Sequence, residues 1–146
     1  MINNIKKCYL DTNILIGFKH EDSIFYKRSK KLLKNLISES FTLYISPLVL
    51  DEFLFQIKLI LQRQQIYKLI NEYLREILNI PKLKIINPPL SKQKQHQVLN
   101  YMEKYSLRPR DAYHLLIIKE NKISHFATFD KDFKKVFKAK VIKKFV

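Results

Sequence analysis

Carboxylates recur in four short segments of the sequence, each beside a run of apolar residues. These segments contain Asp11, Asp51 with Glu52, Asp111, and Asp130 with Asp132. They hold six of the 13 acidic residues of the chain. Carboxylate oxygens are hard ligands that suit Mg²⁺ or Mn²⁺. A fold that gathered these groups would raise their pKa values by mutual repulsion, and divalent cations would relieve that repulsion.

Each acid taken singly also has an ordinary structural explanation. Asp11 is flanked by apolar residues and suits either a buried site or the cap of a following helix. Asp111 lies in the first turn of a predicted helix, where the helix dipole favours an acid. Asp130 lies nearer a strand end, whereas Asp132 is the better candidate to cap the short helix that follows. Only the joint placement of these acids points to a shared site.

Asp51 and Glu52 are neighbours on one predicted helix, so their side chains point about 100° apart. Glu52 lies nearer the apolar face that contains Phe53, and Asp51 shares its stripe with Lys58. The pattern therefore predicts that Glu52 points inward and that Asp51 faces solvent.

The charge balance indicates an anionic partner. The chain has 28 Lys and Arg against 13 Asp and Glu, a net charge of +15, and a field of that sign attracts nucleic acid. A composition generally rich in lysine would explain the charge equally well, but not the positions of the acids. Gly17 is the only glycine, which excludes the common glycine-rich phosphate loops.

The length of 146 residues predicts a single domain over residues 1–146. Cys8 is the only cysteine, so an internal disulfide is excluded and a cysteine-based zinc site is not expected. The first residues lack the apolar stretch of a signal peptide, and no apolar run is long enough to span a membrane. We therefore expect a protein of the reducing cytoplasm.

Alternating apolar patterns and cap signals predict strands that alternate with helices. The expected strands are 8–10, 41–45, 83–86, 125–128 and, as a fifth candidate, 140–142; the expected helices are 14–18, 23–40, 47–62, 65–78, 91–105 and 109–121. This order predicts an α/β fold with a mostly parallel sheet of four or five strands covered on both faces. Ligands of such sheets bind beyond the carboxyl ends of the strands, where Asp11 and Asp130 fall.

The ordered set of motifs resembles the PIN domain family and, within it, the VapC-like toxin ribonucleases. The resemblance rests on the segments 10–15, 46–53, 110–115 and 127–133, which read LDTNIL, SPLVLDEF, RDAYHL and ATFDKDF. It covers almost the whole chain in the expected order and spacing.

The resemblance implies a Rossmann-like, three-layer α/β/α fold and cleavage of RNA with Mg²⁺ or Mn²⁺. It assigns catalysis and metal binding to Asp11, Glu52, Asp111 and Asp130, and supporting positions to Thr12, Asn13, Thr128 and Asp132. It also implies frequent homodimers and a small antitoxin partner. The expected reaction is in-line attack of water on an RNA phosphodiester, leaving 5′-phosphate and 3′-hydroxyl ends, with Arg108 and Arg110 as candidate RNA contacts.

Three alternatives remain at this point. A phosphatase with Asp11 as its nucleophile generally has a second acid two residues later, where this chain has Asn13. An RNA-binding protein without catalysis would use the positive charge but leaves the acids unexplained. A degenerate PIN domain that serves only as a scaffold also leaves the acids unexplained.

The four histidines have no common metal spacing, and we expect His114 to be a packing or hydrogen-bonding residue.

Overall fold

The structure is a computed structural model that describes residues 4–145 of the chain. The strands are β1 (Lys7–Leu10), β2 (Thr42–Ile45), β3 (Leu83–Ile85), β4 (His125–Ala127) and β5 (Lys143–Lys144). The helices are α1 (Thr12–Lys19), α2 (Tyr26–Ser38), α3 (Pro47–Leu61), α4 (Ile66–Leu78), α5 (Lys92–Tyr105), α6 (Pro109–Glu120) and α7 (Lys134–Lys138), with a 3₁₀ turn (Lys131–Phe133) before α7.

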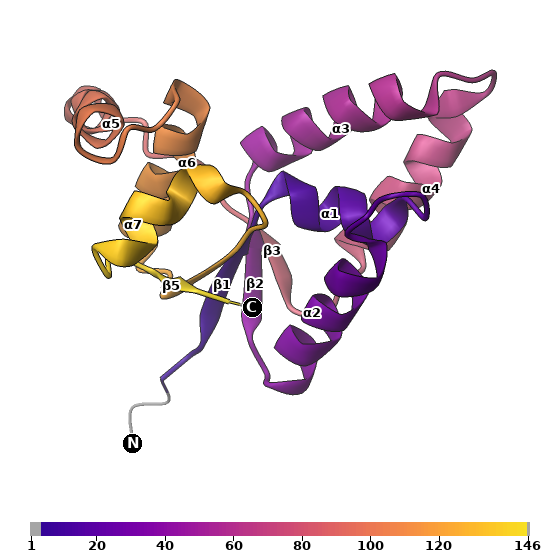
Figure 1. The fold of residues 1–146 in the computed structure, drawn as a ribbon, viewed down its shortest axis with the longest axis horizontal. Coiled ribbons are helices and arrows are strands. Elements are labelled where there is room, and N and C mark those ends of the chain that lie inside the picture. Colours follow the sequence, from indigo (N-terminus) through magenta and orange to yellow (C-terminus); the bar gives the residue numbers. More distant parts are fainter. Residues whose placement is uncertain (1–3, 146) are drawn as a thin grey trace.

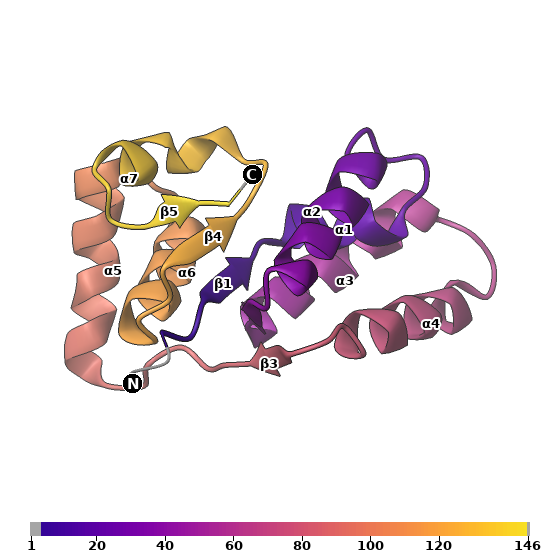
Figure 2. The same cartoon turned by 90° about the horizontal axis from the view of Figure 1, so that it is seen from below.

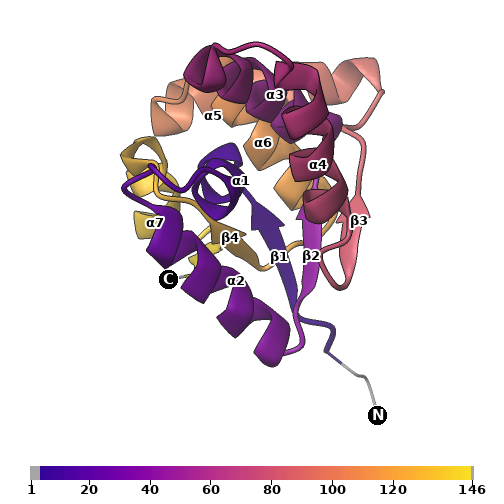
Figure 3. The same ribbon diagram turned by 90° about the vertical axis from the view of Figure 1, so that its right-hand side faces the viewer.

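The five strands form one sheet in the order β3-β2-β1-β4-β5, and every neighbouring pair is parallel. The predicted α/β fold with a parallel sheet is therefore confirmed. The chain builds the sheet from β1 outward to β3 and then returns to place β4 on the other side of β1, so the strand order reverses between β1 and β4. In Figure 3 the arrowheads of β1 and β2 point to the same end of the sheet.

Helices cover both faces of the sheet. Figures 1 and 2 show α1 to α4 on one side and α5 to α7 on the other. The three central strands β1, β2 and β4 are largely buried between these layers, whereas the edge strands β3 and β5 are mostly exposed. In β1, Cys8, Tyr9 and Leu10 are all at 0% exposure. Burial on both faces explains why β1 is a continuous apolar run instead of an alternating one.

The helices α3, α5 and α6 begin where the sequence signals predict. Ser46 caps α3 by accepting a hydrogen bond from the backbone N–H of Val49, and a proline occupies the first turn. Ser91 caps α5 in the same way, and Pro109 opens α6. These caps fix the chain direction just beyond the strands. Within the described residues, none of the helices has both the length and the apolar character that a membrane crossing requires.

The prediction for the fifth strand is wrong in its position. The segment 140–142 forms the turn that closes α7, in which Lys140 has a φ of 56° and the backbone N–H of Val141 bonds to the carbonyl of Val136. The ladder with β4 begins only at Lys143. The apolar character that suggested a strand serves to bury Ile142, which is 5% exposed.

Candidate metal centre

Asp11 directly follows β1 and occupies the reversal point of the sheet. Its backbone N–H continues the ladder by bonding to the carbonyl of Ala127 at 3.0 Å. Its carboxylate caps α1, because Oδ1 accepts from the backbone N–H of Thr12 at 2.7 Å. The side chain is only 6% exposed, and this burial raises its pKa. Asp11 is therefore both the helix cap and a buried acid, the two alternatives that the sequence left open.

Polar side chains after β1 and β4 hold the Asp11 carboxylate in place. Thr128 donates its hydroxyl to Asp11 Oδ2 at 2.6 Å. Asn13 Nδ2 lies 3.4 Å from the same oxygen and 3.2 Å from Thr128 Oγ1. Asn13 Oδ1 also accepts from the backbone N–H of Phe129 at 3.2 Å. The ends of two neighbouring strands are thus tied together around one carboxylate.

Glu52 points inward from α3, as the helical pattern predicts, while its neighbour Asp51 is exposed. The Glu52 side chain is 12% exposed. Its Oε1 lies 2.7 Å from His114 Nε2, and its Oε2 accepts from the Thr12 hydroxyl at 3.4 Å. Arg110 approaches from the solvent side, with Nε 3.7 Å from Oε1. Glu52 is thereby held beside Asp11 from a separate element.

His114 connects Glu52 to the interior of the protein through hydrogen bonds. Its Nδ1 lies 2.8 Å from the Tyr9 hydroxyl, which lies 2.7 Å from Ser46 Oγ. A neutral imidazole that donates from Nε2 to Glu52 accepts at Nδ1 from Tyr9. These two hydrogen bonds confirm the prediction of a hydrogen-bonding histidine. His114 is also buried, with 1% exposure.

The sequence reasoning nevertheless missed where His114 lies. One ligand atom each from Asp11, Glu52 and His114 lies within 4.8 Å of the others. The signal that could have located it is its position three residues after Asp111, which places both on one side of α6.

A second group of acids lies on the solvent side. Asp111, in the first turn of α6, together with Asp130 and Asp132, offers carboxylate oxygens within 4.8 Å of one another. The prediction that Asp132 caps the short helix is wrong. Phe133 precedes α7 and makes no side-chain cap bond. Asp130 instead caps the 3₁₀ turn before α7, where its backbone is still extended and its Oδ1 accepts from the Asp132 N–H at 2.9 Å.

The two groups share one electrostatic environment. The pKa of Asp111 is raised to about 6, first by burial and then by the negative charges of Asp130 and Asp11. Asp11 therefore influences Asp111 although 100 residues separate them in the sequence. Arg108, which is 82% exposed, has its guanidinium 3.8 Å from Asp132.

The residues present fit a divalent cation. Four carboxylates of different segments, with an imidazole behind them, provide mainly hard oxygen donors. The pKa of Asp111 is raised first by burial and then by the neighbouring negative charges, and a cation held by these oxygens would relieve that repulsion. This donor chemistry suits Mg²⁺ and Mn²⁺ alike.

Comparison with protein families gives one match that spans most of the chain. The model described as the PIN domain matches residues 8–138. Ribonuclease VapC6 of Methanocaldococcus jannaschii is 26% identical over 152 residues, which covers 92% of this chain and 95% of that protein.

Solved structures share the fold at lower sequence identity. The crystal structure of FitAcB from Neisseria gonorrhoeae matches with a TM-score of 0.70 and 20% identity, over 95% of this chain and 96% of that one. A toxin–antitoxin complex from Klebsiella pneumoniae matches with a TM-score of 0.60 and 20% identity, over 86% and 89% of the two chains.

Proposed function

The chain belongs to the PIN domain family, and on this premise we propose that it is a VapC-like ribonuclease that hydrolyses RNA with a divalent metal. The observation that carries the proposal is that two acidic groups, Asp11 with Glu52 and Asp111 with Asp130, lie near enough for Asp11 to raise the pKa of Asp111, at the end of the sheet where the strand order reverses. The family match and the similarity to a protein named ribonuclease VapC6 support it.

The four carboxylates hold the metal, which we propose is Mg²⁺ or Mn²⁺. When bound, the ion lowers the pKa of a water molecule and stabilises charge on the phosphate. Asp11 is fixed for this role by Thr12, Asn13 and Thr128, and Glu52 by His114. Asp132 lies at the outer edge of the site, where it extends the acidic surface.

The reaction is an in-line displacement at phosphorus. A water oxygen forms the new bond to phosphorus as the bond to the 3′ oxygen breaks, leaving a 5′-phosphate and a 3′-hydroxyl. Arg110 is 53% exposed and contacts Glu52 through Nε, which leaves its remaining N–H groups for a phosphate. Arg108 is a second phosphate contact at the rim. The net charge of +15 attracts the strand to this site.

Partners of two kinds follow from the same family. We propose that the chain is the toxin of a toxin–antitoxin pair and that a small antitoxin covers the site, in line with the toxin–antitoxin complex that shares its fold. We also propose a homodimer. Apolar side chains of α3 that a partner chain would bury support it, since Leu54, Phe55 and Leu59 are 38%, 64% and 53% exposed.

The test is RNA cleavage by the parent protein and by Asp11→Asn, with Mg²⁺ or Mn²⁺ and with EDTA. We expect metal-dependent cleavage by the parent, no cleavage in EDTA, and loss of activity in the variant with an unchanged circular dichroism spectrum. Equal cleavage rates for parent and variant would remove the proposed site.

A further inference from the structure

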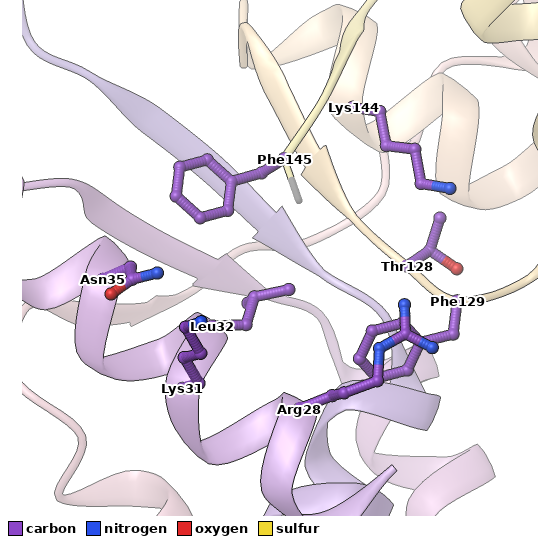
Figure 4. A pocket seen from close by; sticks show the side chains of 8 residues that line it. All are labelled: Arg28, Lys31, Leu32, Asn35, Thr128, Phe129, Lys144 and Phe145. Carbon is purple, nitrogen blue, oxygen red and sulfur yellow. The ribbon is translucent and has the colours of Figure 1, made fainter.

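A cavity of about 340 Å³ opens beside the acidic site. It lies between α2, the end of β4 and β5 (Figure 4). Its volume is within the range of roughly 300–1,000 Å³ that is usual for small-ligand sites. Thr128 belongs to both places, because it lines the cavity and donates its hydroxyl to Asp11. A ligand in the cavity would therefore adjoin a phosphate held at the carboxylates.

The cavity is lined by cations. Arg28 and Lys31 come from α2 and Lys144 from β5, and no acidic side chain of residues 4–145 lines it. None of the ion pairs found within those residues uses any of these three cations. Figure 4 shows Arg28 and Lys144 extending toward Thr128 from different elements. Cations without an internal partner favour an anionic ligand, and a phosphate satisfies them.

Aromatic rings form the remaining walls. Phe129 stacks on Phe25 with centroids 4.5 Å apart, and the Arg28 guanidinium lies 4.6 Å from the Phe129 centroid. Phe145 lines the cavity from the C-terminal side. Rings and guanidinium planes are the surfaces on which proteins stack unpaired bases. The cavity thus combines donors for a phosphate with surfaces for a base.

We propose that this cavity binds one nucleotide of a single-stranded RNA, next to the phosphate that is cut. Its phosphate lies among Arg28, Lys31 and Lys144, and its base lies against the aromatic wall. The inference rests on the proposed function and deepens it, because it assigns a site that selects single-stranded RNA and sets the register of the strand at the carboxylates.

Two lysines at opposite edges of the sheet provide a matched test. Lys144 lines the cavity on β5, whereas Lys84 is exposed on β3. Lys144→Glu and Lys84→Glu change the net charge equally, so only a local contact distinguishes them. We expect the dissociation constant for a short fluorescent single-stranded RNA, measured in EDTA, to rise about tenfold for Lys144→Glu and less than about twofold for Lys84→Glu.

Two further measurements sharpen the test. The slope of log affinity against log salt should fall by about 1 for Lys144→Glu and stay unchanged for Lys84→Glu. A 5′-nucleoside monophosphate should displace the RNA at a lower concentration than inorganic phosphate does. Equal displacement by the two would overturn the assignment of a base to the cavity.

Failure of this inference is separable from failure of the proposed function. Equal dissociation constants for the two lysine variants would overturn the cavity as an RNA site, even if the parent cleaves RNA with metal. An acidic protein segment would then be the remaining occupant. A difference between the variants without any cleavage by the parent would support the cavity and overturn the ribonuclease.

Discussion

The two groups of acids at the end of the sheet are built differently. Asp11 is buried, Glu52 is only 12% exposed, and both are hydrogen-bonded from several elements. Asp111, Asp130 and Asp132 lie nearer the solvent, and the one hydrogen bond among them joins Asp130 to the backbone of Asp132. The inner group is preorganised by the fold, whereas the outer group has few internal contacts and a carboxyl, Asp111, whose pKa is raised by burial and by neighbouring negative charges.

The largest effect should come from removing an inner carboxylate. We expect Glu52→Gln to lower the RNA cleavage rate by more than about 100-fold, beyond the 10- to 100-fold typical of residues that only support a metal ligand. Asp51→Asn on the same helix should stay within about twofold, because an exposed acid has no part in the site. Single-turnover cleavage rates measure both. Similar losses for the two variants would mean that the inward orientation of Glu52 has no consequence.

The next effect concerns the free energy of unfolding. It compares a residue that holds the inner acids in place with a residue of the outer acidic group. His114→Ala should lower the free energy of unfolding by about 2–3 kcal/mol, because it removes one hydrogen-bond partner from both Glu52 and the Tyr9 hydroxyl in a largely buried place. Asp132→Ala should stay within about 0.5 kcal/mol. Urea denaturation in EDTA provides the measurement. If Asp132→Ala lowered the free energy of unfolding as much as His114→Ala, the contacts of the outer group would stabilise the fold as much as those of the inner group.

The smallest effect has the opposite sign and depends on pH. The pKa of Asp111 is raised to about 6 in the fold, so this side chain contributes stability below its unfolded pKa that is lost as pH rises to about 6. At pH 7 without metal, Asp111→Asn should therefore stabilise the protein, by about 1 kcal/mol after allowance for partial exposure. Thermal unfolding in EDTA should show this gain at pH 7 and its loss near pH 4. A variant less stable than the parent at pH 7 would contradict burial and repulsion as the cause of the raised Asp111 pKa.

The sequence predicts most of the fold because its signals are local. The apolar run before Asp11 predicts β1, and the pair Ser46-Pro47 and the proline Pro109 mark the starts of α3 and α6 correctly. The fifth strand was misplaced because apolar residues of a buried turn have the same composition as those of a short edge strand. Only the ladder with β4 distinguishes them.

The candidate site was predictable as a list of acids but not as an arrangement. The spacing of apolar residues along α3 is visible in the sequence, and it predicts that Glu52 is more buried than Asp51. The hydrogen bonds of His114 to Glu52 and Tyr9 join three elements, and no local pattern specifies such contacts. Asp130, and not Asp132, serves as a cap because the backbone turns directly after Asp130. The sequence alone leaves the position of this turn open by two residues.

The most direct test of convergence is anomalous diffraction from crystals of the parent protein soaked in Mn²⁺. We predict a manganese peak bound by Asp11 together with at least one of Glu52, Asp111 and Asp130, and its absence from crystals of Asp11→Asn. A parent protein that cleaves RNA with Mn²⁺ but binds the ion away from Asp11 would contradict the account.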